Sequence, residues 1–212
     1  MSERCSELHH MAHRMSAFSF PFDPKAIDAN GIYVLFEAGE YAHGGFRIVR
    51  VGTHTGEKQL RSRLLQHFVK PNKDRSIFRK NIGRAILNEA KDPFLAQWEF
   101  DLTTKASRNK HAGTVEIEKQ VAVEKHVTEY IQENFSFVIF PVDEIENRLR
   151  LESRMISTLS LCEECGPSES WLGLHSPKAK IRTSGLWVVN QLYKTPLAEA
   201  ELARLRYLVQ KC

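Results

Sequence analysis

Short runs of β-branched and aromatic residues lie on either side of a turn-rich segment early in the chain. Residues 32–36 and 46–51 form the two runs, and three glycines lie between them. This pattern predicts a β-hairpin. Residues 59–69 follow with leucine and phenylalanine at helical spacing, so an amphipathic helix is expected directly after the hairpin.

Helical and extended patterns alternate in the rest of the chain. Ser76 is a suitable N-cap for the next helix, and the apolar run at 135–142 is typical of a buried strand. The predicted elements are helices at 76–90, 115–134 and 143–160, strands at 94–102 and 135–142, a mobile loop at 103–114, a long loop at 161–180 and a last helix opened by Pro196.

A carboxylate interrupts the apolar stripe of the helix that begins at residue 143. Ile145, Leu149 and Ile156 set the stripe, and Glu152 occupies the position where the next apolar residue is expected. A carboxylate on such a face is costly unless it is paired or coordinates a cation. Both a buried Glu–Arg pair and a metal ligand fit this pattern.

Charge is concentrated in one part of the chain. The whole sequence carries +4, but residues 47–84 hold eleven Lys and Arg against two acidic residues, and the remainder carries −5. A basic block on predicted helices is either a solvated surface or a binding surface for phosphates. The side chains expected to contact nucleic acid are Arg50, His54, Arg61, Lys70, Lys73, Arg75, Arg79, Lys80 and Arg84.

Length and composition are those of one ordinary globular domain. The 212 residues contain no apolar run long enough to span a membrane and no secretory signal. The four cysteines are too few and too scattered for a disulfide framework, so we expect a reducing, cytoplasmic location. Cys162 and Cys165 form one CxxC pair, and a zinc site would need two more ligands, from His175, Cys212 or elsewhere.

Short motifs lie at fixed places on the hairpin and on the helix after it. Gly31-Ile32-Tyr33 opens the first strand, Arg50-Val51-Gly52 ends the second, and the helix carries Arg63 one turn before His67. Together these motifs resemble the core of the GIY-YIG nuclease superfamily. Glu152 matches the metal-binding glutamate that this family carries on a later helix. The resemblance implies an α+β fold with a small antiparallel sheet flanked by helices.

The resemblance also implies a role for each of these side chains. Tyr33 would orient or deprotonate the attacking water, with His67 as the neighbour that accepts or polarises its proton. Arg63 would bind the scissile phosphate through its planar guanidinium. Glu152 would hold one Mg²⁺ or Mn²⁺ ion.

Two positions depart from the family pattern. Arg50 replaces the first tyrosine of the YIG motif, and it could instead contact phosphate. Many members of the family place an asparagine after the metal-binding helix; the loop position that looks closest here ends in Ser170, and the only asparagine beyond Glu152 is Asn190.

We therefore expect a single domain in three parts. Residues 1–25 would be a flexible N-terminal arm, in which several histidines have metal-binding spacing, and residues 26–160 the GIY-YIG-like core. Within the core, residues 91–134 look like an insertion. Residues 161–212 would form a loop and a C-terminal helical extension packed on the core or on a second subunit.

Two functions from different classes fit these observations. The first is a Mg²⁺-dependent DNA endonuclease of the restriction or defence type, which would read a short palindrome as a homodimer or bind its halves in sequence. The insertion near Trp98 to Asn134 and the loop near Trp171 are its candidate base contacts. The second is a catalytically degenerate GIY-YIG fold that binds nucleic acid without cutting it. A zinc-stabilised interaction protein is a third reading.

Overall fold

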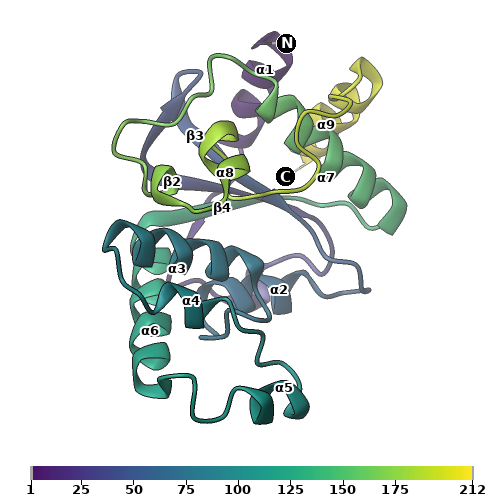
Figure 1. Cartoon of the computed structure of the whole chain (residues 1–212). Helices are drawn as coiled ribbons and strands as arrows, with labels where there is room; N and C mark the ends of the chain where they lie inside the picture. Colours follow the sequence, from purple (N-terminus) through teal and green to yellow (C-terminus); the bar gives the residue numbers. More distant parts are fainter. Residues whose placement is uncertain (1, 212) are drawn as a thin grey trace.

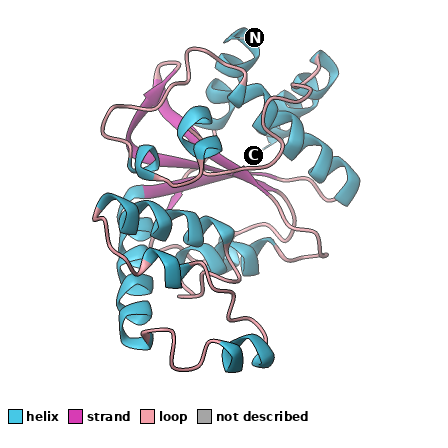
Figure 2. Cartoon of the chain, viewed as in Figure 1, coloured by secondary structure: helices cyan, strands magenta, loops and turns pink. Residues whose placement is uncertain are grey.

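The computed structural model describes residues 2–211 and arranges helices on both sides of one small sheet (Figures 1 and 2). Its elements are, in order, α1 (Ser2–His13), β1 (Phe18–Ser19), η1 (Pro24–Ala26), β2 (Ile32–Ala42), β3 (Gly45–Gly52), α2 (Leu60–Phe68), α3 (Ile77–Glu89), α4 (Leu95–Trp98), α5 (Lys105–Lys110), α6 (Ile117–Asn134), β4 (Phe135–Phe140), α7 (Ile145–Ser160), η2 (Leu172–His175), α8 (Ala179–Ser184) and α9 (Glu199–Lys211).

The sheet has four strands in the order β1-β4-β2-β3, and all neighbouring strands are antiparallel. The predicted hairpin is confirmed, and its strands extend to the turn, where Ala42 pairs with Gly45. The predicted helices at 59–69, 76–90 and 115–134 correspond to α2, α3 and α6. Among residues 2–211, no helix combines the length and the apolar character needed to cross a membrane.

Two apolar cores lie on the two faces of the sheet. Helices α1, α7 and α9 cover one face, and α2, α3 and α6 lie on the other (Figure 1). Along β2, Ile32 and Val34 enter the first core, whereas Tyr33 and Leu35 enter the second. Because both faces are covered, β4 is apolar at almost every position, which is why its sequence predicted a buried strand.

The predicted flexible N-terminal arm is wrong for its first half. Residues 2–13 form α1, which buries Cys5, Leu8 and Met11 in the core that also contains residues of α7 and α9. The helix has few apolar residues, so its sequence shows no clear helical periodicity. These few side chains nevertheless form a narrow stripe that is buried in the fold. Tertiary packing, rather than local periodicity, therefore holds this end of the chain.

The region 91–134 differs from its prediction in two places. The strand expected at 94–102 is instead the short helix α4, and the loop expected at 103–114 contains α5. Trp98, which favoured the strand, is fully buried and donates its indole N–H to the carbonyl of Lys80, 3.0 Å away. A Cβ atom at Gly83 would lie 2.4 Å from the Trp98 ring, so α3 receives this ring only because it has glycine there.

A buried ion pair joins helices α2, α3 and α6. The guanidinium of Arg79 donates to Glu124 Oε2 at 2.8 Å, to the His67 carbonyl at 3.0 Å and to Thr128 Oγ1 at 2.6 Å. Arg79 is fully buried and Glu124 is 4 % exposed. Because water cannot reach these groups, removal of one partner would leave the other buried without compensation.

We expect Arg79→Ala to lower the free energy of unfolding by about 3–5 kcal/mol, because it leaves the Glu124 carboxylate buried and unpaired. Urea denaturation at neutral pH measures this change. Lys125→Ala is the matched control, since Lys125 adjoins Glu124 in sequence but has a 76 % exposed side chain in a loose pair with Glu129. A control effect as large as that of Arg79→Ala would contradict the assignment of the stabilisation to the buried pair.

Candidate active site

Tyr33, His67 and Ser76 form a buried chain of hydrogen bonds. The Tyr33 hydroxyl lies 2.8 Å from His67 Nε2, and His67 Nδ1 lies 2.7 Å from Ser76 Oγ. Ser76 also accepts the Arg79 backbone N–H, so the residue that caps α3 fixes the imidazole. Three separate elements thus orient one proton path that leads from the tyrosine to the histidine.

The His67 ring is kept neutral by its surroundings. It is fully buried, and burial together with the positive charges of Arg63, Arg50 and Arg79 lowers its pKa well below 6.5. A neutral imidazole can accept a proton from the Tyr33 hydroxyl through Nε2 when Nδ1 carries the other proton. The geometry therefore fits a histidine that receives a proton rather than one that is already charged.

Gly52 provides the space for the Tyr33 hydroxyl. A Cβ atom at residue 52 would lie 2.2 Å from the Tyr33 oxygen and 2.4 Å from Cζ, so no other residue fits without a shift. Gly31 is equally confined, because its Cβ would lie 2.7 Å from the Phe140 carbonyl oxygen. Each of the two glycines in the motifs is therefore required by a close approach between neighbouring strands.

Glu152 approaches the same strand end from α7. Its Oε1 atom accepts the backbone N–H of Thr53, the residue after Gly52, at 3.1 Å. The structure corrects the predicted stripe, because Ile145 and Leu149 are 43 % and 40 % exposed. The buried face of α7 instead contains Leu151 and Met155, and Glu152 lies at its edge, half-buried.

The Glu152 carboxylate lines a cavity of about 230 Å³. Burial raises its pKa above 4.5, while the charges of Arg50 and Arg63 and the Thr53 N–H favour the ionised form. Arg50, Asn81 and Asn190 line the same cavity. The carboxylate thus faces cationic and amide groups in a recess, and no direct ion pair with Lys or Arg neutralises it among residues 2–211.

Arg50 occupies the position of the first YIG tyrosine and is only 6 % exposed. Its guanidinium donates to the Trp187 carbonyl and lies 5.1 Å from the centre of the Phe78 ring. Its Nε atom is buried and has no hydrogen-bond partner in the described part of the chain. Arg50 is therefore fixed at the wall of the Glu152 cavity with one donor unused.

Arg63 and His54 line a second cavity, of about 300 Å³, next to the first. Thr53 borders this cavity and also holds Glu152, so the two recesses meet at the end of β3. Arg63 is half-buried and donates to the Arg75 carbonyl at 3.0 Å. His54 faces the Gly56 carbonyl through Nδ1 at 2.6 Å, and its buried Nε2 has no partner among residues 2–211.

The basic residues predicted to contact nucleic acid fall into three groups by burial, with Arg50 and His54, described above, among the buried ones. Lys73, Arg79 and Arg84 are buried, and each is held in internal ion pairs or hydrogen bonds, so the prediction that they extend a basic surface is corrected. Lys80 is half-buried beside Asp74. The exposed members are Arg61, Lys70 and Arg75.

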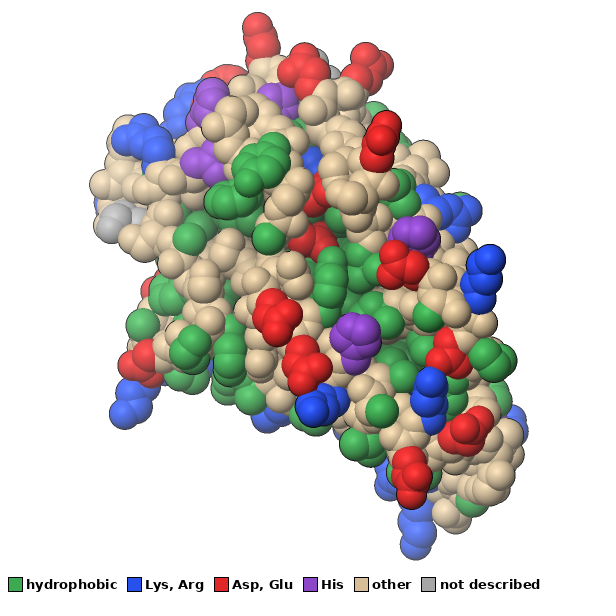
Figure 3. Space-filling view, turned by 90° about the vertical axis from the view of Figure 1, so that its left-hand side faces the viewer, with side chains coloured by type: hydrophobic (Ala, Val, Ile, Leu, Met, Phe, Trp, Pro, Cys, Tyr) green, Lys and Arg blue, Asp and Glu red, His purple; other side chains and the backbone are tan. Residues whose placement is uncertain are grey.

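The face shown in Figure 3 does not carry the basic surface. Asp and Glu side chains are interspersed there with Lys and Arg, and no broad area of one sign is visible (Figure 3). This face is the left-hand side of Figure 1, whereas α2 and α7 lie toward the right. The site residues and the exposed cations of α2 therefore belong to another part of the surface.

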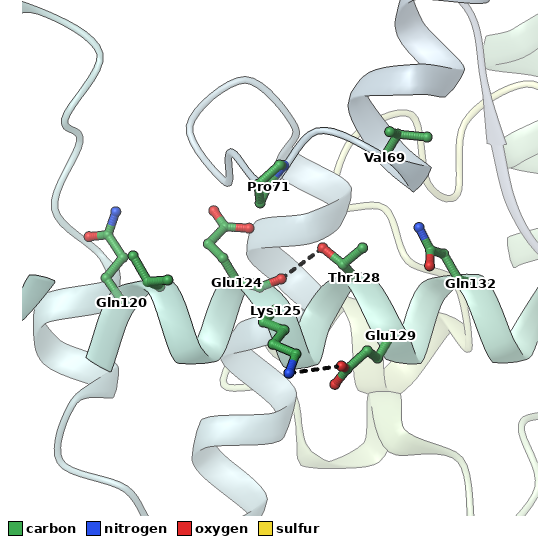
Figure 4. Close-up of a pocket in the computed structure, with 9 residues that line it drawn as sticks. Val69, Pro71, Gln120, Glu124, Lys125, Thr128, Glu129 and Gln132 are labelled. Atoms are coloured by element: carbon green, nitrogen blue, oxygen red, sulfur yellow. Dashed lines mark hydrogen bonds and ion pairs between the residues drawn. The ribbon is translucent and has the colours of Figure 1, made fainter. Parts of the chain in front are cut away.

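A further cavity, of about 450 Å³, lies between the end of α2 and the side of α6. Lys125 and Glu129 approach each other to 3.7 Å at its edge, and Thr128 donates to the Glu124 carbonyl at 2.8 Å (Figure 4). None of the four proposed catalytic side chains lines this recess. Its lining groups bond within α6 or to α2 and α3, apart from Gln120 Oε1, which is buried without a partner among residues 2–211.

The tryptophans that mark the two regions proposed for base contacts are part of the interior. Trp98 is fully buried, and Trp171 is 2 % exposed. The Trp171 indole donates to Glu37 Oε2 at 2.7 Å, and Trp187 donates to the same oxygen at 2.8 Å. These two rings are therefore unavailable for stacking on bases.

Several residues of the site were not assigned to it from the sequence. Ser76 was expected only as a helix cap, and Thr53 acts through its backbone N–H, which any residue but proline would supply. Asn190 had one signal, as the only asparagine beyond Glu152. It lines the Glu152 cavity, whereas the Ser168–Ser170 segment instead contacts Glu40.

Comparison with protein families agrees with this geometry. The family model described as "GIY-YIG domain" matches residues 6–212, nearly the whole chain. The chain therefore belongs to the GIY-YIG domain family, which supports a nuclease-type function and DNA as the substrate class. No curated protein and no solved structure matches the chain.

We expect Gly52→Ala to destabilise the fold by about 1–3 kcal/mol and to break the Tyr33–His67 hydrogen bond, because the new Cβ would overlap the tyrosine hydroxyl. Thermal unfolding measures the first effect, and the Tyr33 hydroxyl environment can be followed by NMR. Gly166→Ala is the control, since a Cβ there meets nothing within 4 Å. Equal stability of the two variants would contradict the close approach.

The depressed pKa of His67 predicts acid sensitivity. His67 is neutral in the folded chain, whereas in the unfolded chain it takes up a proton below pH ~6.5. The contribution of its neutral ring to the free energy of unfolding is therefore complete above that pH and is lost as the pH falls below it. Between about pH 6 and 4.5, His67→Gln should reduce the slope of unfolding free energy against pH by up to ~1.4 kcal/mol per unit. Exposed His126→Gln should leave the slope as in the wild type; an unchanged slope in His67→Gln would contradict the buried neutral ring.

Proposed function

We propose that the chain is a Mg²⁺-dependent DNA endonuclease of the restriction or defence type that acts in the cytoplasm. The observation that carries this proposal is that a possible proton acceptor and a possible metal ligand lie close together at the end of β3. The Tyr33–His67 pair, 2.8 Å apart, lies on one side of Gly52, and the Glu152 carboxylate binds the next residue, Thr53. Hydrolysis of a phosphodiester needs both a proton acceptor and a site for a cation close together.

Tyr33 and His67 provide the proton path in this proposal. Water attacks phosphorus as Tyr33 takes one of its protons and passes its own to His67 Nε2. The bond from phosphorus to the leaving oxygen breaks, and that oxygen takes a proton from solvent. The Tyr33 side chain has no exposed surface. The strand end at Gly52 must therefore open slightly when DNA binds, so that water can reach the hydroxyl.

Arg63 and Arg50 provide positive charge for the phosphate. Arg63 borders the cavity next to Glu152, and Arg50 forms part of the wall of the Glu152 cavity. The unused Nε donor of Arg50 suits a phosphate oxygen. Arg50 would thus compensate by charge for the missing tyrosine of the YIG motif.

Glu152 is the residue that would hold Mg²⁺. Its carboxylate lines a cavity that Asn190 also lines, and it has only the Thr53 N–H as a hydrogen-bond donor among residues 2–211. Mg²⁺ is commonly bound by one carboxylate together with waters and substrate phosphates, so this donor set fits. When bound, the ion would stabilise the negative charge that develops on the phosphate oxygens.

DNA would approach from the side of α2. Arg61, Lys70 and Arg75 are exposed on this helix and the segment after it, and half-buried Arg63 lies between them and the cavities. These cations would bind the DNA backbone without reading its sequence. Two copies of the chain would be needed to cut both strands of a palindrome symmetrically.

The alternative is a GIY-YIG fold that binds DNA without cutting it. Two observations favour it: Arg50 stands in place of a catalytic tyrosine, and the Tyr33 hydroxyl is closed off from solvent. The retained Tyr33–His67 bond and the half-exposed Glu152 favour catalysis instead. A cleavage experiment separates the two.

We expect the wild type to cut plasmid or phage DNA with Mg²⁺ and to lose this activity with EDTA. Glu152→Gln, which keeps the shape of the side chain but removes its charge, should lower the cleavage rate by roughly 10²–10³-fold. Exposed Glu146→Gln on the same helix is the matched control and should cut as the wild type does. Gel analysis of discrete fragments measures both.

Retarded but intact DNA, identical for the wild type and Glu152→Gln, would contradict the nuclease proposal and favour the binding module. Arg63→Gln helps to interpret such a result. In the nuclease it lowers cleavage more than binding, whereas in a binding module it weakens binding only, to the extent of one phosphate contact.

A further inference from the structure

A cluster of sulfur and imidazole groups lies on the face of the sheet opposite His67. Its members come from three distant parts of the chain: α1, the β2–β3 turn and the loop after α7. Figure 1 shows α1 beside α7 and α9, above the sheet. The side chains that meet there are Cys5, His9, His43, Cys162 and Cys165.

The distances within this cluster are those of a metal site. Cys5 Sγ lies 3.3 Å from Cys165 Sγ, and Cys162 Sγ lies 3.5 Å from His43 Nε2. The ligand atoms of Cys5, His9, His43 and Cys165 all lie within 4.8 Å of one another. Tetrahedral zinc, with Zn–S near 2.3 Å and Zn–N near 2.0 Å, separates its ligand atoms by about 3.3–3.8 Å.

Hydrogen bonds decide which imidazole is the ligand. His9 Nε2 accepts the Ile48 backbone N–H at 3.1 Å, so the proton of this ring is on Nδ1, which donates to the Cys5 carbonyl at 2.9 Å. Both nitrogens of His9 are thus engaged by the backbone. His9 therefore packs beside the cluster without serving as a ligand. Four possible metal ligands remain: Cys5, His43, Cys162 and Cys165.

His43 is oriented as a zinc ligand usually is. Its Nε2 atom points toward Cys162, and its Nδ1 atom lies 3.7 Å from the Glu164 carboxylate. A carboxylate behind a histidine fixes the ring and its tautomer in many metal sites. The His43 side chain is only 4 % exposed although the residue belongs to a turn.

The backbone at His43 is also unusual. His43 has φ of +49° and Gly44 has φ of +80°, which makes a two-residue turn of the type normally formed by asparagine or glycine. Because His43 adopts this conformation and its side chain points inward, its imidazole can act as a ligand in the cluster. The turn therefore aims the imidazole at the three sulfurs.

We propose that Cys5, His43, Cys162 and Cys165 bind one structural zinc ion that fastens α1 and the hairpin turn to the loop after α7. Three thiolates and one imidazole form a closed tetrahedral set with no open position for chemistry. The three cysteines are buried free thiols, and a disulfide would use only two of them. Zinc accounts for all three and for the histidine.

The proposed ion would hold a loop that contributes to the rest of the fold. Shortly after Cys165, Ser168 donates its backbone N–H to Glu40, and Glu40 forms a buried ion pair with Arg47. Arg47 in turn donates to the Gly185 carbonyl at 2.5 Å, next to the segment that supplies Trp187 and Asn190. Loss of zinc would loosen this connection without removing any proposed catalytic side chain.

The test is the metal content of the untagged full chain, measured by elemental mass spectrometry after dialysis. We expect about one zinc per wild-type chain, and less than ~0.2 for Cys165→Ser and for His43→Asn. His10→Asn is the matched control, because His10 is exposed on α1 and should leave the zinc content unchanged. Removal of zinc should lower the melting temperature, and added zinc should restore it.

Substitution of Co²⁺ into the wild type tests the ligand set even if a variant fails to fold. Intense thiolate-to-cobalt absorption together with tetrahedral d–d bands is expected. Wild type that neither contains zinc nor takes up Co²⁺ would overturn the proposal. So would a disulfide, seen as two reactive thiols instead of four in the denatured, unreduced chain.

These measurements do not depend on DNA cleavage. A chain that contains zinc but does not cut DNA would support the zinc site and contradict the nuclease function. A chain that cuts DNA without containing zinc would support the nuclease function and contradict the zinc site. EDTA removes both kinds of ion, so zinc content should be measured alongside any loss of cleavage. Restoration of cleavage by Mg²⁺ alone would show that the activity lost with EDTA depended on Mg²⁺.

Discussion

The active-site geometry depends on the missing side chain at Gly52. This glycine lets the Tyr33 hydroxyl pass beneath the end of β3, where a Cβ atom would lie only 2.2 Å from the oxygen. The tyrosine can then reach His67 on α2, while the next backbone N–H, at Thr53, remains free to bind Glu152 on α7. One close approach between neighbouring strands therefore aligns helices from both faces of the sheet at a single point.

Much of the fold could be predicted because its elements have strong local patterns. The hairpin, α2, α3, α6 and β4 all show apolar spacing that matches their final structure. The predictions that failed concern elements in which contacts with distant residues override the local sequence preference. The sequence around Trp98 predicted a strand, but in the fold the Trp98 ring packs against Gly83 of α3 in the core. Helix α1 was missed because the stripe of apolar residues that it buries is narrow.

The site was predicted less completely, for a different reason. Tyr33, Arg63, His67 and Glu152 could be found because a family pattern marks them in sequence. Charge, in contrast, does not reveal burial: Arg79 reads as a surface cation, yet its partner Glu124 lies 45 residues away and can be found only in the folded chain. Asn190 likewise reaches the Glu152 cavity through tertiary folding alone.

Helix α7 would separate the two proposed metal sites. Glu152 lies within the helix, about 12 Å along the axis from the last helical residue, Ser160, and Cys162 follows two residues later. A carboxylate with amide neighbours suits a hard ion such as Mg²⁺, whereas thiolates and imidazole prefer zinc. Because the donor sets differ, each ion would avoid the other's site. The helix that would present the catalytic carboxylate could then be held at its far end by an ion that takes no part in hydrolysis.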